Sequence, residues 1–487
     1  MTLVTSTVFV SAPNAANIDE LPDIGSPSDA ILSRKIESHI GRQVYYTLLE
    51  SGKVVTDPEI QEYIQSVGME LVAHAGIDGQ RFQFFVMNDP VINAFALPGG
   101  YIGVHTGLLL ATDNESELAG VLAHEISHVT QRHISRAVFA NQANSTLSMA
   151  ALLGAILVGV ATGADPGMIS GAVGASQGMA MEAQIGFTRS NEYEADRVGV
   201  GVLADAGFDP MGMPDFFETM GRASGSLSGN RIPEFLLTHP MSSDRMAESR
   251  ARAQKYPIVE TNDSNGYEIA RARIRLLTSS RPEAALEQFK QLQNSPDKAG
   301  KLEIEYGVAI ANMQMGNYKT AEGQLTTLLS NNEEIIPLHS ALAISQAKTG
   351  DTDKALTTFE TAMQLFPRNV PLTVHYCEML INTGHATKAH EILLDLLNQV
   401  PPTQEQVRLI AIAANTAGDT AEANYYMAEY HAMSGSLLLA IEQLKLALST
   451  PGLDNVDRAR FTTRLNEFQS YLPDRNKQKD KKKENNQ

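Results

Sequence analysis

The spacing of apolar side chains divides the chain into a mixed N-terminal half and a helical C-terminal half. In the first half, apolar residues recur with helical spacing over 28–52 and 57–75. Three shorter apolar runs bounded by Pro and Gly predict strands: FQFFVMND, VINAFALPGG and YIGVHTG. The pattern therefore predicts an α+β domain that is mostly helical and holds a small β-sheet.

The C-terminal half repeats itself with a period of 34 residues. Each repeat contains G-x-x-x-x-A, with a small side chain seven positions before the glycine. This period is that of the tetratricopeptide helix pair, in which small residues let two helices approach closely. We therefore predict an all-α tetratricopeptide-repeat solenoid over 263–472, and such arrays bind peptides or partner proteins. The matching positions are Gly316/Ala321, Gly350/Ala355, Gly384/Ala389 and Gly418/Ala423, preceded by Ala309, Ala343, Cys377 and Ala411.

Charge and composition narrow the functions that remain open. The formal net charge of −18 argues against general binding to nucleic acid, which needs a basic surface. The one cysteine, Cys377, cannot form an intrachain disulfide, and its place at a predicted helix crossing favours a buried small residue over a reactive thiol. Residues 473–487 are charged and poor in apolar side chains, so we expect a disordered tail.

Candidate chemistry concentrates in LAHEISHVTQRH, residues 122–133, which contains the pattern H-E-x-x-H. On a helix, His124 and His128 lie roughly 40° apart, so both imidazoles face the same way. Two neutral imidazoles can bind Zn²⁺ while Glu125 stays off the metal and handles the proton of a water molecule. His133 lies roughly 140° from His128, so we predict a solvated or second-helix contact for it. The alternative for the whole stretch is a surface helix with incidental histidines.

A third ligand is expected from a second predicted helix, FTRSNEYEADRVGVGVL, residues 187–203. Glu192 and Asp196 are four residues apart and share a face, whereas Glu194 points away. We assign Glu192 to the metal and Asp196 to orienting a ligand imidazole. The alternative is an ordinary acidic helix start, which the helix dipole favours, and the neighbouring H-E-x-x-H weighs against it.

Four segments in this order resemble the M48 family of zinc metallopeptidases: NAFALPGG, HEISH, NEYEAD and THPMSSDR. The resemblance implies a zincin-like metallopeptidase domain over 19–262 that binds one Zn²⁺ per chain. It implies His124, His128 and Glu192 as ligands, Glu125 as the catalytic base and Asp196 as a supporting carboxylate. It further implies that His239, in the His-Pro segment, occupies the fourth position of the metal in a latent state. Arg245 is expected near the site, toward an oxyanion.

The segment NAFALPGG is expected to be an edge strand that pairs with the backbone of an extended substrate. Asn93, Ala94 and Phe95 are the candidate substrate-binding residues, and the Asn93 side chain is expected to fix the adjoining turn. The alternative is a structural hairpin, and the two roles are compatible.

Three segments concern export and membranes. Residues 1–18 join an apolar run to SAPNAAN, typical of a signal-peptidase site, so we expect a signal-peptide remnant or a loose N-terminus. Residues 147–164 carry no charge over nearly the length of a membrane span, and 167–181 are also uncharged. Their Gly, Ala, Ser and Met favour a hydrophobic hairpin that covers the active site or touches the membrane surface, over a true span.

An M48-like domain followed by such repeats resembles peptidases of the periplasm of Gram-negative bacteria. The resemblance therefore implies an envelope endopeptidase, possible association with the outer membrane, and contact with the β-barrel assembly machinery through the repeats. Its substrates would be unfolded or misassembled outer-membrane proteins. The alternative is a repeat-based chaperone or scaffold whose proteolysis is latent.

Overall fold

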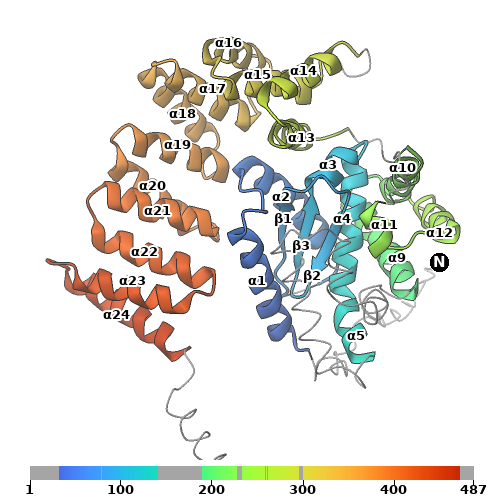
Figure 1. The fold of residues 1–487 in the computed structure, drawn as a ribbon, viewed down its shortest axis with the longest axis horizontal. Coiled ribbons are helices and arrows are strands. Elements are labelled where there is room, and N and C mark those ends of the chain that lie inside the picture. Colours follow the sequence, from blue (N-terminus) through green and yellow to red (C-terminus); the bar gives the residue numbers. More distant parts are fainter. Residues whose placement is uncertain are drawn as a thin grey trace, which may run out of the picture.

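The computed structural model describes residues 32–77, 79–140, 189–226, 233–257, 259, 262–295 and 300–471. Within these ranges a mostly helical domain with one small sheet is followed by a curved array of paired helices (Figure 1). This is the predicted α+β domain followed by an all-α solenoid. The signal-peptide remnant expected at 1–18, the hydrophobic hairpin expected at 147–181 and the charged tail expected at 473–487 lie outside the described residues. In the ranges that are described, no helix combines the length and apolar character needed to cross a bilayer.

The sheet has three strands in the order β1-β3-β2: β1 (Gln83–Met87), β3 (Tyr101–His105) and β2 (Ala94–Leu97). Strand β1 pairs parallel with β3, and β2 pairs antiparallel with β3. Strand β2 is thus an edge strand, as expected for NAFALPGG. Its position matters because it contacts the helix that carries the H-E-x-x-H residues.

Helices surround this sheet, and several begin at a side-chain cap. Asp57 accepts a hydrogen bond from the backbone N–H of Ile60 at the start of α2, and Ser33 does the same for Ile36 in α1. These caps explain why both helices begin inside the predicted ranges. The helices of this domain are α1 (Arg34–Glu50), α2 (Pro58–Ala73), α3 (Thr106–Ala111), α4 (Glu115–Thr130), α5 (His133–Ala140), α9 (Arg189–Asp205), α10 (Gly212–Ser226), α11 (Glu234–Thr238) and α12 (Ser243–Ala253).

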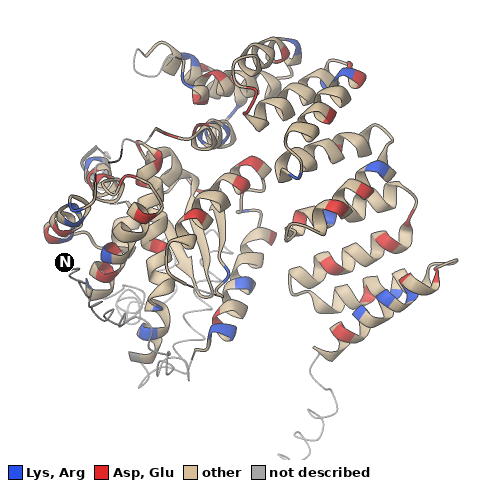
Figure 2. Cartoon of the chain, turned by 180° about the vertical axis from the view of Figure 1, so that it is seen from behind, with Lys and Arg blue, Asp and Glu red and all other residues tan. Residues whose placement is uncertain are grey.

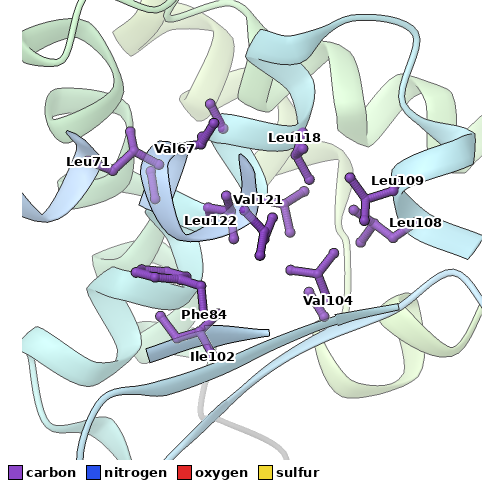
Figure 3. Packing of buried hydrophobic residues seen from close by; sticks show 14 of the residues in the cluster. Val67, Leu71, Phe84, Ile102, Val104, Leu108, Leu109, Leu118, Val121 and Leu122 are labelled. Carbon is purple, nitrogen blue, oxygen red and sulfur yellow. The ribbon is translucent and has the colours of Figure 1, made fainter. Parts of the chain in front are cut away.

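Helix α4 lies at the centre of the domain and is buried continuously from Glu115 to His128. Figure 3 shows its side chains packed against residues from α2, α3 and the sheet. A helix buried on all sides is held by packing along its whole length, so its polar side chains sit in a rigid apolar frame. The labelled members of this core are Val67, Leu71, Phe84, Ile102, Val104, Leu108, Leu109, Leu118, Val121 and Leu122.

The repeat region contains six helix pairs among the residues described. Four pairs carry the predicted pattern, and all four of their glycines have positive φ, which supports the prediction that glycine turns the chain. One further pair precedes them and one follows. The small residues predicted at the helix crossings are buried, Cys377 included. The pairs are α13 (Asn265–Thr278) with α14 (Pro282–Gln293), α15 (Leu302–Gln314) with α16 (Tyr318–Leu329), α17 (Ile336–Lys348) with α18 (Thr352–Leu365), α19 (Val370–Asn382) with α20 (Ala386–Leu397), α21 (Gln404–Thr416) with α22 (Thr420–Met433), and α23 (Leu437–Ser449) with α24 (Asn455–Ser470).

The array curves around the side of the first domain that carries α1 and α2 (Figure 1). A buried ion cluster joins the two parts. Glu59 in α2 lies 2.9 Å from the Nε2 of His375 in α19 and 3.1 Å from a guanidinium nitrogen of Arg273 in α13. Acidic side chains are otherwise spread over both parts, consistent with the net charge of −18 (Figure 2).

Candidate zinc site

The H-E-x-x-H residues meet the second predicted helix because α4 and α9 approach closely. At the crossing, a Cβ added to Gly199 would lie 3.2 Å from the backbone of Ala123 and 2.7 Å from the side chain of Met213. A larger side chain would separate the helices, so glycine is required here. The close approach brings Glu192, in the first turn of α9, to the face of α4 that carries His124 and His128.

Four side chains form a buried cluster in which one donor atom of each lies within 4.8 Å of the others: His124, His128, Glu192 and His239. The Nε2 atoms of His124 and His128 are 2.9 Å apart. The Glu192 carboxylate lies 3.6 Å from the first ring and 3.5 Å from the second. Imidazole nitrogens and a carboxylate, gathered in this way, are the donor set of a zinc site.

Asp196 and Arg245 lie behind His124. The Nδ1 of His124 is 3.0 Å from an Asp196 oxygen, which leaves its Nε2 for the cluster. Arg245 donates from Nε and Nη2 to the two oxygens of Asp196, both at 2.8 Å. Its Nη1 lies 2.8 Å from the Glu192 carboxylate and donates to the carbonyl of Pro240. Arg245 therefore holds two carboxylates in place. Its expected role toward an oxyanion stays a prediction.

His133 lies behind His128. The two Nδ1 atoms are 2.9 Å apart, and the Nε2 of His133 is 3.2 Å from the carboxylate of Glu194. His133 is thus in contact with a second helix, α9, but it is fully buried and not solvated. Glu194 points away from the cluster, yet it faces His133 and Arg136.

Glu125 and His239 face each other beside the cluster. The Nε2 of His239 is 3.4 Å from Glu125, while its Nδ1 is 3.3 Å from Glu192. Both Glu125 oxygens are buried, with the backbone of Ala96 and the His239 ring beside them. Burial raises the pKa of Glu125, and the nearby His239 and His124 offset only part of that rise. A carboxylate with a raised pKa suits a general base.

Negative charge dominates the electrostatics of the cluster. Burial alone would lower the pKa of His124, but Asp196 and Glu192 raise it to about 10. Burial alone would raise the pKa of Glu192, but hydrogen bonds from His124 and His239 hold it well below its usual range. Burial and the adjacent His124 lower the pKa of His128. The carboxylates therefore favour a positive charge between the imidazoles, which is the condition that a bound cation meets.

Comparison with known proteins identifies the family. The model of peptidase family M48 matches residues 58–253, and a tetratricopeptide-repeat model matches 346–412. The putative beta-barrel assembly-enhancing protease of Vibrio cholerae is 34% identical over 450 residues, which cover 92% of each chain. The beta-barrel assembly-enhancing protease of Escherichia coli K12 is 32% identical over 460 residues, 93% of this chain and 92% of that one. The chain belongs to peptidase family M48.

A shorter similarity covers the peptidase half. Mitochondrial metalloendopeptidase OMA1 of Arabidopsis thaliana is 30% identical over 193 residues, 40% of this chain and 36% of that protein. The resemblance inferred from the four sequence segments is thus confirmed. This M48 chain is a zinc-dependent metalloendopeptidase with tetratricopeptide repeats. The donor set fits zinc, because both imidazoles turn an Nε2 into the cluster while their Nδ1 atoms face partners behind them.

In this M48 peptidase, only part of the expectation for the candidate substrate-binding residues agrees with the structure. Ala94 and Phe95 lie on the edge strand β2, but the side chains of Asn93 and Ala94 are buried. Asn93 donates to Glu234 in α11 at 3.3 Å, so the expectation that it fixes the turn is wrong. Asp89 does so instead, by accepting from the backbone N–H of Val91. Phe95 is only partly buried, so a substrate contact at these residues stays a prediction that involves the backbone of β2 and the Phe95 side chain.

Three side chains behind the cluster were not fully predicted from the sequence: His133, Glu194 and Arg136. A second-helix contact was expected for His133, but its partners His128 and Glu194 were not named, and the pairing of Arg136 with Glu194 at 2.8 Å was not foreseen. The acidic residues at the start of α9 and the histidines of residues 122–133 indicated a polar cluster, but neither feature identifies the pairs of residues in contact. Contacts between residues about sixty positions apart depend on the crossing of α4 and α9, which local spacing does not determine.

Proposed function

We propose that this chain is an envelope endopeptidase that cleaves unfolded or misassembled outer-membrane β-barrel proteins in the periplasm of a Gram-negative bacterium. The buried cluster of His124, His128 and Glu192 beside Glu125 supports the peptidase activity. The similarity to beta-barrel assembly-enhancing proteases over more than nine-tenths of the chain supports the class of substrate. The helix pairs are proposed to recruit these substrates or the β-barrel assembly machinery, and the outer membrane is the proposed place of contact.

In this proposal His124, His128 and Glu192 hold the zinc ion. When bound, zinc polarises the scissile carbonyl and lowers the pKa of a water molecule beside it. Glu125 takes the proton of the attacking water and delivers it to the leaving amine. Its burial and its position beside the metal-binding cluster support this role. Asp196 holds the His124 ring, and Arg245 holds Asp196, so both residues fix the orientation of the His124 imidazole. The edge strand β2 aligns the substrate backbone.

His239 is proposed to keep the site latent. Its ring lies between Glu192 and Glu125, where it blocks the base. It follows α11, a helix of five residues, and precedes Pro240, so it can move with a short segment and leave α4 in place. We therefore expect His239→Ala to cleave faster than the wild type or to lose regulation. Complete loss of cleavage with zinc retained would instead indicate a catalytic part for this imidazole.

The test compares the wild type with Glu125→Gln, using zinc content and cleavage of an unfolded casein-type substrate. The variant should keep zinc and lose cleavage by about 10²–10⁴-fold. Glu70→Gln, on the exposed surface of α2, is the matched control and should behave as the wild type. A preparation of wild-type chain that takes up no zinc would overturn the assignment.

The alternative, a scaffold with latent proteolysis, is tested in cells. Glu125→Gln should fail to repair the envelope defects of a strain that lacks the chain. Full repair by that variant would favour the scaffold and contradict the proposed role of cleavage.

A further inference from the structure

His133 reaches the back of His128 because the helix is interrupted between them. Helix α4 ends at Thr130, and Arg132 adopts φ +53°, a conformation that non-glycine residues adopt uncommonly. Helix α5 then begins at His133. On a straight helix the two rings would face directions roughly 140° apart. The interruption instead places their Nδ1 atoms 2.9 Å apart in the protein interior.

Donors and acceptors alternate from His128 through His133 to Glu194. If the Nε2 of His128 offers its lone pair to the cluster, its Nδ1 carries the proton and donates to the Nδ1 of His133. His133 then carries its own proton on Nε2, which lies 3.2 Å from Glu194. Glu194 also accepts from Arg136 at 2.8 Å. Each donor therefore meets an acceptor.

The same construction occurs behind the other ligand imidazole. The Nδ1 of His124 faces Asp196, and Asp196 is held by Arg245. Both rings are thus supported by a carboxylate that an arginine pairs with, directly for His124 and through His133 for His128. The difference is that Asp196 and Arg245 are buried, whereas a quarter of the Glu194 side chain and nearly half of the Arg136 side chain are exposed.

We infer that His133 and Glu194 are positioning residues that fix the orientation and tautomer of His128 and so set the zinc affinity of the site. This inference rests on the proposed role of His128 as a ligand. Groups that orient a metal-binding histidine typically change metal affinity by about 10–100-fold when they are removed. The contacts of His133 and Glu194 lead to the cluster through His128, so we expect their effect on zinc binding.

The first test measures zinc dissociation constants of the full-length chain by competition with a chromophoric chelator. His133→Asn keeps an acceptor where Nδ1 lies, and His133→Gln keeps a polar group only where Nε2 lies. We expect His133→Gln to bind zinc about 10–100-fold more weakly than the wild type, and His133→Asn to recover most of that loss. Thermal unfolding of the zinc-free proteins shows whether each variant is folded.

A purely structural role for His133 predicts a different order, because Gln is nearer to His in volume than Asn. Equal zinc affinity of the two variants, or tighter binding by His133→Gln, would overturn the inference. A wild type that fails to bind zinc would instead overturn the proposed function, so the two failures are distinguishable.

The second test removes a carboxylate charge at two places on the same helix. Glu194→Gln should weaken zinc binding about tenfold. Asp205→Asn, at the exposed end of α9, removes the same charge far along the helix and should leave zinc binding unchanged. If the two variants bind zinc equally tightly, Glu194 does not support His128 and the inference fails.

Discussion

The peptidase half and the repeat half of the molecule bury different kinds of side chain. Around α4, the interior encloses ionisable groups that compensate one another, such as Arg245 with Asp196 and Glu192. In the repeats, the most enclosed positions at helix crossings are small and apolar, such as Ala343 and Ala411. Stability in the first half therefore depends on matched charges as well as on apolar packing, whereas at the helix crossings of the second half it depends on side-chain volume. The two halves should respond to different kinds of substitution.

The largest difference is expected for the buried arginine. Arg245→Met leaves Asp196 and Glu192 without their shared cation and should lower the free energy of unfolding by about 3–5 kcal/mol. Arg250→Met is the matched control on the same helix, because Arg250 pairs with carboxylates at the surface. It should cost at most about 1 kcal/mol. Urea unfolding of the zinc-free proteins measures both, and equal losses would contradict the contrast.

The junction between the halves should make stability depend on pH. Burial alone would lower the pKa of His375, but Glu59 and Glu378 raise it to about 10, above the usual 6.5. Its stabilising contribution is therefore complete below about pH 6.5 and is lost as the pH rises through about 10. Glu59 behaves oppositely: burial opposes ionisation, but Arg273 and His375 lower its pKa, so its contribution is lost as the pH falls below 4.5.

Between pH 6 and pH 9, His375 should therefore account for a loss of about 3 kcal/mol in the wild type. His375→Gln cannot be protonated and should remove this slope. Melting temperatures at the two pH values provide the measurement. His74, which is exposed on α2, supplies the control variant His74→Gln, which should keep the wild-type slope. An unchanged slope in His375→Gln would exclude the junction as its cause.

Within the repeats, the expected sensitivity is to volume. Ala343→Leu adds three carbon atoms at a fully buried helix crossing and should cost about 2 kcal/mol. Ala459→Leu makes the same change on the exposed face of α24 and should be nearly neutral. Thermal unfolding distinguishes the two, and cleavage of a short peptide by the peptidase half should persist in both. A large loss of stability in Ala459→Leu would show that this face of α24 is packed against another part of the protein.

The smallest effect is expected at a turn glycine. Gly384 has φ +84° and no atom within 4 Å of an added Cβ, so Gly384→Ala should cost only the backbone strain, about 1 kcal/mol. Gly323→Ala, inside α16 with equally open surroundings, should stabilise by about 1 kcal/mol. Chemical denaturation measures both changes, and the same sign for the two would contradict the assigned role of glycine at the turns.

Periodicity and spacing predicted most of the architecture. The 34-residue period identified four helix pairs, because their glycine turns and small crossing residues recur in phase. The first pair was not identified by the pattern, since its helices are joined at Ser279 to Arg281 before Pro282 and no glycine marks the turn. Helical spacing also predicted that His124 and His128 share a face and that Glu192 and Asp196 share another.

The contacts that were not predicted depend on backbone conformation or on packing. The projection that turned His133 away from His128 assumed a straight helix, and the positive φ of Arg132 removes that assumption. Arg245 was expected to face a developing charge in the substrate, but only the assembled structure shows it between two carboxylates. Such pairings join residues far apart in the chain, and no local pattern encodes them.

The enclosure of α4 has a consequence for how the enzyme can be controlled. Moving His124 or His128 would disturb the contacts that this helix makes with the sheet, α9 and α10. Rotating His239 on the short segment between α11 and α12 disturbs far fewer contacts. If His239 is the group that leaves the site, as proposed, the geometry of the metal-binding pair stays constant between the latent and the active enzyme.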